Sequence, residues 1–390
     1  MNIAVGGPYS KKENIGLKLF KLKLRIMDIM NKNKKQVSRR KFLGNTVAAA
    51  AISMVPLNFA FRNAPKLVAG AKPDSSFGGV QIGTITYSWR SMPGGVENII
   101  RYCLETGISS IELMSNDVEE YLGAPKNPMM GMFGPRPAPP APAAAPAPGV
   151  APAPAAAATP APRQRPPMTP EQQAAMAKYN EEIKAWRLAL PITKFEDVRK
   201  KFDDAGVNIH IVKFSPSRWS DEEIDYAFKA AKVLGAKGIT EEIGEEAVKK
   251  LGPIAEKHGM YAIFHNHMQF ATPGFSYDPF LAVSPAVMMN FDAGHFFGST
   301  GLHPNTIIEK YHDRIFSLHI KDKTGPNADP ANTNQVWGQG EMPLADVLLL
   351  IKNEKWPIHC DIELEYDVKP WSNAVKEVKT CVDYVRAILL

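Results

Sequence analysis

Histidines and acidic residues gather at the ends of apolar runs in the second half of this 390-residue chain. Five consecutive runs that read as strands finish in, or are closely followed by, such residues: Glu241-Glu242; His265-Asn266-His267; Asp292 and His295; His319 and Lys321; Glu363 and Glu365. A single residue of this kind is more often structural. Imidazoles and carboxylates buried together, however, need a compensating charge, which a divalent cation supplies. The recurrence therefore predicts a metal site, whose mixed donors suit Mn²⁺, Co²⁺, Zn²⁺ or Mg²⁺.

Such a site needs a framework that brings the strand ends together, and the sequence from residue 79 onward predicts one. Apolar β-rich runs alternate with amphipathic stretches of helical period. The expected strands are 80–87, 109–114, 208–214, 238–242, 261–265, 287–292, 315–320 and 358–363. The expected helices are 96–106, 171–188, 195–205, 221–234, 245–258, 278–283, 304–312, 344–353 and 374–389.

This β-then-α alternation favours a closed (β/α)₈ barrel, the TIM barrel, in which polar residues at the carboxyl ends of the strands meet at one face. A doubly wound open sheet is the alternative. It is disfavoured because no glycine-rich phosphate loop follows the first strand. We expect the barrel to occupy residues 72–390.

Residues 124–170 interrupt the pattern after the second expected strand. The part from 135 onward is almost wholly Pro, Ala and Gly, a composition that cannot bury a core and favours an extended, low-complexity insertion. The insertion leaves the barrel at the face expected to carry the site. A lid or a tether to a partner is one interpretation, and a tolerated surface insertion is the simpler one.

Residues 1–71 are predicted to be an N-terminal extension that contains an export signal. Ser38-Arg39-Arg40-Lys41-Phe42-Leu43 precedes an apolar run at 46–60, and small residues at 69–71 form a candidate cleavage site. The paired arginines are typical of a twin-arginine signal, so the export machinery is an expected partner and the periplasm the expected location. The apolar run is short and alanine-rich for a membrane span, so we do not expect an integral membrane protein. Translation could also begin at Met27 or Met30.

The charge distribution argues against a nucleic-acid partner. Residues 1–41 hold twelve Lys or Arg and two acidic residues, a net +10, so the rest of the chain carries −4 of the total +6. No basic stripe interleaved with aromatic residues is present in the sequence. The three cysteines, Cys103, Cys360 and Cys381, are too few and too scattered for a disulfide framework, and we expect buried thiols.

The segment 79–390, without the insertion, resembles the sugar phosphate isomerase/epimerase superfamily, the xylose isomerase-like TIM barrels. Its His265-Asn266-His267 run resembles the inosose-dehydratase-like branch. The resemblance implies that Asp292 and His319 bind a metal ion. It implies the same of Glu363, in preference to Glu365, and that His295 contacts the substrate.

One feature departs from the family pattern. Epimerases of this kind usually carry a glutamate on the fifth strand as both ligand and acid/base, and here His265 or His267 takes that place. The fourth metal ligand is then expected to be Glu242, with Glu241 or His265 as alternatives. Side chains alternate along a strand, so only one of the two glutamates can face the site.

The resemblance implies a metal-dependent isomerase or epimerase that acts on a sugar through an enediolate. His265, His267 or Glu363 would remove the proton next to the carbonyl, while His295 and Lys321 would hold substrate oxygens. Export favours an unphosphorylated carbohydrate as the substrate.

Other functions stay open at this stage. The same first step could serve a lyase or dehydratase that acts on a 3-keto-glycoside or a keto-inositol. The related apurinic endonucleases share the barrel, but they need three metal ions and a basic face for DNA, which the acidic body does not offer. A barrel that binds sugar without catalysis is the alternative of another class.

Overall fold

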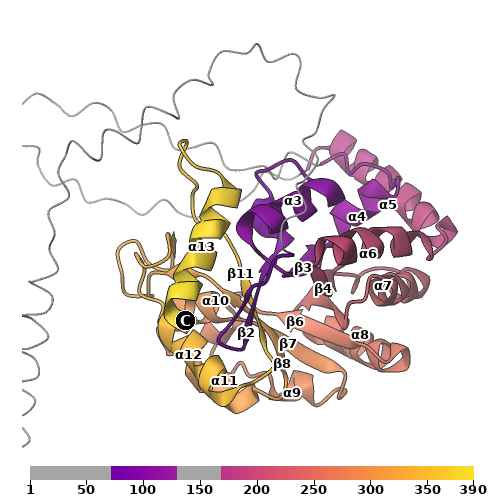
Figure 1. Ribbon diagram of the computed structural model, residues 1–390. Coiled ribbons are helices and arrows are strands. Elements are labelled where there is room, and N and C mark those ends of the chain that lie inside the picture. The colour runs from indigo at the N-terminus through magenta and orange to yellow at the C-terminus, as the bar shows by residue number, and fades with distance from the viewer. Residues whose placement is uncertain (1–71, 130–167) are drawn as a thin grey trace, which may run out of the picture. The chain divides into compact units, whose positions relative to one another are not determined.

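The computed structural model describes residues 72–129 and 168–390, in which parallel strands form a closed barrel (Figure 1). The barrel strands are β2 (Val80–Ile85), β3 (Ser110–Met114), β4 (Asn208–Lys213), β5 (Gly238–Glu242), β6 (Tyr261–His265), β7 (Val287–Asp292), β8 (Ile315–Ile320) and β11 (His359–Ile362). Each strand pairs in parallel with the next, and β2 pairs with both β3 and β11, which closes the ring. The predicted TIM barrel is confirmed.

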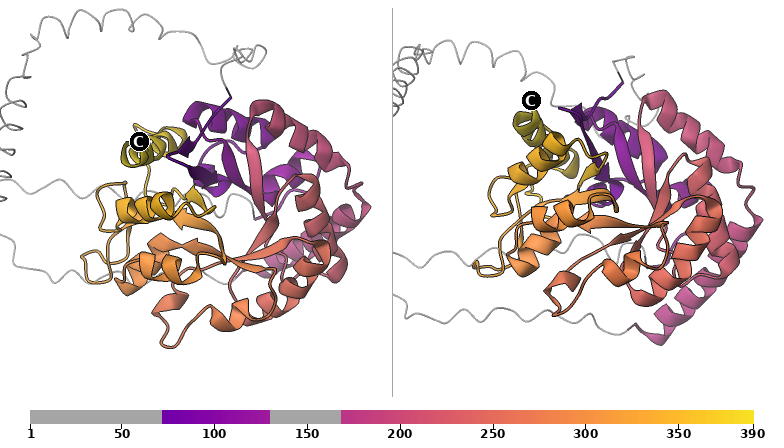
Figure 2. Two further views of the ribbon diagram at one scale, coloured as in Figure 1. Left: turned by 60° about the horizontal axis from the view of Figure 1, so that its bottom comes forward. Right: turned by 90° about the horizontal axis from the view of Figure 1, so that it is seen from below.

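Helices surround the strands on the outside, as the views in Figures 1 and 2 show. They are α3 (Val96–Thr106), α4 (Ser115–Tyr121), α5 (Pro170–Ala189), α6 (Lys194–Ala205), α7 (Asp221–Val233), α8 (Glu245–His258), α9 (Asp278–Leu281), α10 (Ala293–Thr300), α11 (Asn305–Tyr311), α12 (Leu344–Glu354) and α13 (Ala374–Leu389). Shorter elements are β1 (Ser76–Phe77), the hairpin of β9 (Asp322–Lys323) with β10 (Asn334–Gln335), and 3₁₀ turns at Thr86–Trp89 and Gln269–Ala271. Local signals set several boundaries: Ser220 caps the start of α7, and Gly259 adopts the left-handed conformation that ends α8.

The barrel has an apolar outside and a polar inside, because neighbouring residues of a strand point to opposite faces. On β3, Ile111 and Leu113 are buried in the hydrophobic core. Glu112, between them, accepts a hydrogen bond from Thr240 Oγ1 (2.6 Å) on β5 and one from Asn290 Nδ2 (2.9 Å) on β7. Neither strand is a neighbour of β3, so these bonds cross the barrel interior.

A second polar contact crosses the barrel from β4 to β11. His210 Nε2 lies 2.9 Å from Asp361 Oδ2, and both residues are buried. A glycine stands beside this pair on β2: a Cβ atom at Gly83 would lie 2.0 Å from Asp361 Oδ1. Only glycine leaves room for the aspartate here.

The structure adds helices that the sequence did not predict, α4 and α10, each beginning directly after a barrel strand. Both are short, and α10 contains two glycines, which weaken helical propensity. Thr169 and Pro170, which we expected to be part of the insertion, instead cap and begin α5. The predicted signal sequence and the stretch 130–167 lie outside the described residues.

Two further expectations concern the described part of the chain. Cys103, Cys360 and Cys381 are all free and buried, as expected. Among the helices of the two described ranges, none combines the length and the apolar character that crossing a bilayer requires.

Candidate metal centre and active site

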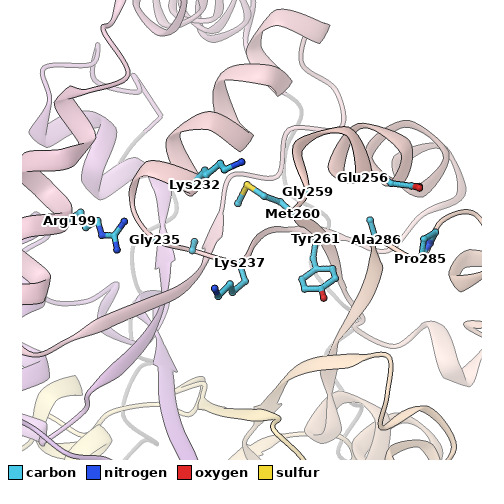
Figure 3. A pocket seen from close by; sticks show the side chains of 11 residues that line it. Arg199, Lys232, Gly235, Lys237, Glu256, Gly259, Met260, Tyr261, Pro285 and Ala286 are labelled. Atoms are coloured by element: carbon cyan, nitrogen blue, oxygen red, sulfur yellow. The ribbon is translucent and has the colours of Figure 1, made fainter.

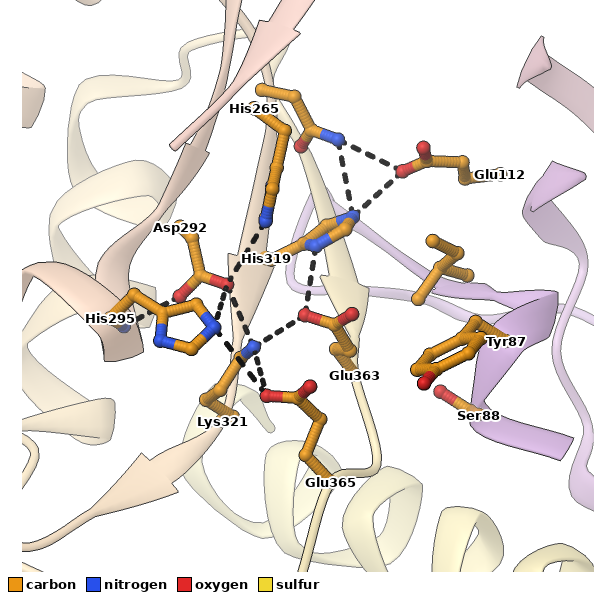
Figure 4. A network of polar contacts seen from close by, with 12 residues as sticks. Tyr87, Ser88, Glu112, His265, Asp292, His295, His319, Lys321, Glu363 and Glu365 are labelled. Atoms are coloured by element: carbon orange, nitrogen blue, oxygen red, sulfur yellow. Dashed lines mark hydrogen bonds and ion pairs between the residues drawn. The ribbon is translucent and has the colours of Figure 1, made fainter. Parts of the chain in front are cut away.

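Four of the residues singled out from the sequence meet at the carboxyl ends of successive strands (Figure 4). His265 ends β6, Asp292 ends β7, His319 lies near the end of β8, and Glu363 follows β11. Each offers a nitrogen or oxygen atom, and these four atoms lie within 4.8 Å of one another. All four side chains are buried.

Asp292 is held by the helix that follows it. It is the N-cap of α10, and its Oδ1 accepts a hydrogen bond from the backbone N–H of His295 (2.7 Å). Its other oxygen, Oδ2, lies 3.8 Å from Nε2 of both His265 and His295. Burial raises the pKa of Asp292, and the positive charge of Lys321 opposes that rise. The cap therefore leaves Oδ2 directed into the cluster.

His319 lies between two carboxylates. Its Nδ1 is 3.0 Å from Glu363 Oε2, and its Nε2 is 2.7 Å from Glu112 Oε2. Burial opposes a charge on this ring, but Glu363 and Glu112 raise the pKa of His319 well above 6.5. The sequence analysis missed Glu112. The signal for it was an acidic residue in the middle of an apolar strand, Ile111-Glu112-Leu113.

Lys321 is buried among carboxylates. Its ammonium lies 2.8 Å from Asp292 Oδ2 and 2.7 Å from Glu365 Oε2, and it also contacts Glu363 Oε2. Burial alone would lower the pKa of Lys321, but the three carboxylates raise it above its ordinary value. The glycine of Asp292-Ala293-Gly294-His295 makes room for this lysine, because a Cβ atom at Gly294 would lie 2.2 Å from Lys321 Cγ.

Glu242, the expected fourth ligand, lies outside the four-residue cluster. Its Oε1 is 2.8 Å from Lys213 Nζ and its Oε2 is 3.2 Å from His267 Nδ1. Burial would raise the pKa of Glu242, but His267 and Lys213 lower it to about 2. Glu241 binds elsewhere, accepting the backbone N–H of Ser217. The structure thus brings His265, and neither glutamate of β5, into the cluster.

His267 and His295 stand beside the cluster. The side chain of His267 is half exposed, and its ring centre lies 4.9 Å from that of His295 and 4.8 Å from that of His265. His295 is nearly buried, with Nε2 3.6 Å from Glu365 Oε2. Burial and the charge of Lys321 lower the pKa of His295 to about 2, which keeps this ring neutral.

The cluster fits a divalent metal ion by the chemistry of its donor atoms and by one buried ring nitrogen that lacks a partner. Nδ1 of His265 is buried and makes no hydrogen bond, and burial lowers the pKa of His265 well below 6.5, so the ring is neutral. Asp292 Oδ2 also accepts no hydrogen bond, although it is ion-paired with Lys321. Two imidazoles with two carboxylates are a donor set that Zn²⁺, Mn²⁺ or Co²⁺ accepts. The Glu112–His319 contact resembles the carboxylate that commonly supports a metal-bound histidine.

A hollow of about 720 Å³ lies at the opposite end of the barrel (Figure 3). It is lined by residues that precede strands, among them Lys237 before β5, Met260 before β6 and Ala286 before β7. None of the predicted site residues lines it. The four-residue cluster and this hollow therefore lie at different faces of the barrel.

Comparison with known proteins gives one family and several similar folds. A family model described as a xylose isomerase-like TIM barrel matches residues 181–386. No curated protein is similar enough to count as a relative. Similar solved structures include a probable 3-DHS dehydratase from Bacillus anthracis, at 13% identity and a TM-score of 0.49 over 78% of this chain and 98% of that one.

Two further solved structures carry names of enzymes. A sugar phosphate isomerase/epimerase from Parabacteroides distasonis has 16% identity and a TM-score of 0.47, over 84% of this chain and 100% of that one. An L-ribulose 3-epimerase has 10% identity and a TM-score of 0.46, over 80% and 94%. At identities this low the likeness concerns the fold and not the chemistry.

Proposed function

The chain belongs to the xylose isomerase-like TIM-barrel family, and from this membership and the site geometry we propose that it is a metal-dependent isomerase or epimerase of carbohydrates. The observation that carries the proposal is the meeting of His265, Asp292, His319 and Glu363 at one face of the barrel. In TIM-barrel enzymes this face holds the active site.

His265, Asp292, His319 and Glu363 would hold one divalent cation. His265 takes the place we first expected for Glu242, because Glu242 already pairs with Lys213 and His267. When bound, the cation supplies Lewis-acid stabilisation for substrate oxygens that gain negative charge as an enediolate forms.

His267 is the proposed acid/base. It is the most exposed of the three predicted catalytic residues, so a substrate can reach it. Its Nδ1 is held by Glu242, which leaves Nε2 for the proton next to the substrate carbonyl. Returning that proton to the neighbouring carbon, while the hydroxyl proton passes to the former carbonyl oxygen, isomerises the sugar. Epimerisation requires a second group to protonate the same carbon from its other face.

His295 and Lys321 have supporting roles in this proposal. The neutral ring of His295 can donate a hydrogen bond to a substrate oxygen without carrying charge. Lys321 offsets the charges of Asp292, Glu363 and Glu365 and so keeps the carboxylates close together. Its direct contact with substrate stays a prediction.

A lyase or dehydratase is the second candidate. The observation that favours it is that the polar residues at the end of β6 are imidazoles, where a glutamate was expected for a two-glutamate epimerase. A His267 that has taken up a proton could pass it to a leaving oxygen on the β-carbon. The substrate would then be a 3-keto-glycoside or a keto-inositol, unphosphorylated if the protein is exported.

Solvent deuterium tests this function. We expect the metal-loaded protein in D₂O to incorporate deuterium next to the carbonyl of a free ketose, with an isomer or epimer as the product. With a 3-keto-glycoside, the lyase would instead release the aglycone.

His267→Gln should slow the exchange roughly 10²-fold or more. The control is His312→Gln, an exposed histidine at the end of α11. Failure to exchange deuterium into any ketose, aldose or keto-glycoside would contradict the proposal.

A further inference from the structure

Two buried lysines lie two residues apart after β8, and only the first of them is in ion-pair contact with the carboxylates of the site. Asp322, between them, accepts hydrogen bonds from the backbone N–H groups of Gly338 (2.8 Å) and Gly340 (2.9 Å). Because side chains alternate along an extended chain, Lys321 and Lys323 point to the side opposite Asp322. That is the side on which Lys321 meets the carboxylates of the metal cluster (Figure 4).

The ammonium of Lys321 has three carboxylate partners, whereas no carboxylate of the described residues forms an ion pair with that of Lys323. The side chain of Lys323 is 3% exposed. Within residues 72–129 and 168–390, no hydrogen bond or ion pair reaches its Nζ. Burial and the neighbouring charge of Lys321 lower the pKa of Lys323, and the carboxylates of Asp292, Glu365 and Glu363, which are not in ion-pair contact with it, offset this lowering only in part. Burying a cation without a counter-charge in contact costs free energy. A lysine in this position is therefore unusual unless a bound ligand supplies the negative charge.

Lys323 belongs to a wall of the active site. Its stem passes under α10, where a Cβ atom at Gly298 would lie 2.7 Å from Lys323 Cε and 2.3 Å from Asn332 Oδ1. Gly298 follows His295 by one helical turn, and the charge of Lys323 is near enough to act on the His295 ring.

Asn332, which lies beside Lys323, also contacts the loop that carries His267. Asn332 Nδ2 contacts the sulfur of Met268 (3.3 Å), which directly follows His267. The Oδ1 atom of Asn332 is buried and accepts no hydrogen bond. The side chain of Lys323 and the unpaired Oδ1 of Asn332 therefore both lie against α10, one turn after His295, and Asn332 also contacts the residue that follows His267.

We propose that Lys323 recognises a carboxylate of the substrate, so that the enzyme acts on sugar acids in preference to neutral sugars. The proposal rests on the function proposed above and names its substrate class. A carboxylate carries the single negative charge that matches one ammonium. A phosphate dianion is usually held by several donors, such as an arginine fork or a helix N-terminus.

Matched substrates test this inference. D-Fructose is compared with D-fructuronate, and D-tagatose with D-tagaturonate. D-Fructose 6-phosphate tests whether a phosphate is preferred to a carboxylate. We expect the acid of each pair to have a KM lower by roughly tenfold or more in the deuterium-exchange assay. Lys323→Met should raise the KM of the acid to that of its neutral partner with a smaller change in kcat, and Lys323→Arg should keep part of the preference. Lys249→Met, which removes an exposed lysine on α8, should keep all of it.

Equal KM values within each pair, or a preference for the phosphate, would overturn the inference while leaving the isomerase proposal intact. The wild-type comparison decides this even if a variant does not fold. Calorimetric titration of the full chain with the same sugars separates the two proposals. One result would be that no sugar is converted, but D-fructuronate binds the wild type and not Lys323→Met. The proposed isomerase reaction would then be wrong, and carboxylate recognition by Lys323 would be supported. If D-fructuronate binds no better than D-fructose, the recognition is wrong.

Discussion

At the scale of single residues, the two carboxylates around His319 determine what each nitrogen of its ring can do. A metal ligand must give up its proton, and the proton must then stay on the other nitrogen. Glu112 lies 2.7 Å from Nε2 and is itself fixed by Thr240 and Asn290, so it is placed to hold that proton. Nδ1, on the side of Glu363, is then free for the metal ion.

Glu112→Gln should therefore weaken metal binding without removing a ligand. We expect the affinity for Mn²⁺ or Zn²⁺ to fall about 10- to 100-fold, the usual effect of losing a carboxylate behind a metal-bound histidine. Calorimetric titration of the metal-free protein measures this. Glu105→Gln, an exposed residue of α3, is the control. An unchanged affinity in Glu112→Gln would show that His319 does not need this partner.

Strand-end residues could be predicted from the sequence, but their pairings could not. His265, Asp292, His319 and Glu363 stand out because each closes an apolar run. Glu242 stands out for the same reason, yet its partners Lys213 and His267 come from the two neighbouring strands β4 and β6, and their side-chain pairing cannot be read from the sequence. Glu112 escaped notice because it lies within a strand, where a charge is tolerated only if the interior supplies partners.

At the scale of elements, one arginine joins α5 to two other helices of the barrel, beside the apolar packing of Ile183 and Trp186. The guanidinium of Arg187 bonds both carboxylate oxygens of Glu119 on α4 (2.8 and 3.1 Å) and one of Glu223 on α7 (3.2 Å). It also lies over the ring of Trp219, 3.5 Å from the ring centre. All three charged side chains are buried. Within the described residues, this is the ion-pair network that joins α5 to α4 and α7.

Arg187→Met should destabilise the barrel, because it leaves two buried carboxylates without their counter-charge. We expect the free energy of unfolding to fall by about 3–5 kcal/mol. Lys200→Met, which breaks an exposed pair with Asp204 on α6, should cost less than about 1 kcal/mol. Chemical denaturation followed by circular dichroism compares the two. Equal effects would mean that the buried network does not hold α5.

The elements themselves were largely readable from the sequence. Periodicity placed α3, α8 and α13 at their observed bounds, with glycine caps at the ends of α3 and α8. α10 could not be read from the sequence, because it is short and contains two glycines, and its start depends on the cap that Asp292 supplies. The β-then-α alternation predicted parallel strands, since these need a crossover between them. A closed ring was favoured over an open sheet because no glycine-rich phosphate loop follows the first strand.

At the scale of the whole molecule, the N-terminal sequence bears on the substrate. Arg39-Arg40 and the apolar run at 46–60 lie outside the described residues, so export stays a prediction. The twin-arginine route would place the enzyme outside the cytoplasm, where unphosphorylated sugars and glycosides are the available carbohydrates. The proposed carboxylate specificity is compatible with that setting, because a sugar acid is charged without being phosphorylated.

Replacing Arg39 and Arg40 by lysine in the full-length chain should block export. In a bacterium with a twin-arginine system, we expect the wild type in the periplasmic fraction and the double variant in the cytoplasm, as detected by immunoblotting. Arg25→Lys lies outside the pair and should be exported normally. Export of the double variant at the wild-type level would contradict the signal assignment.

The central claim is that the buried cluster holds one metal ion, and elemental analysis tests it most directly. The wild type, Asp292→Ala, His319→Ala and the control His312→Ala would be purified without chelator and analysed together. The account predicts about one equivalent of a divalent metal in the wild type and the control, and its loss in both cluster variants. A wild type that is metal-free and does not take up added Mn²⁺, Co²⁺, Zn²⁺ or Mg²⁺ would contradict it and favour a barrel that binds sugars without metal chemistry.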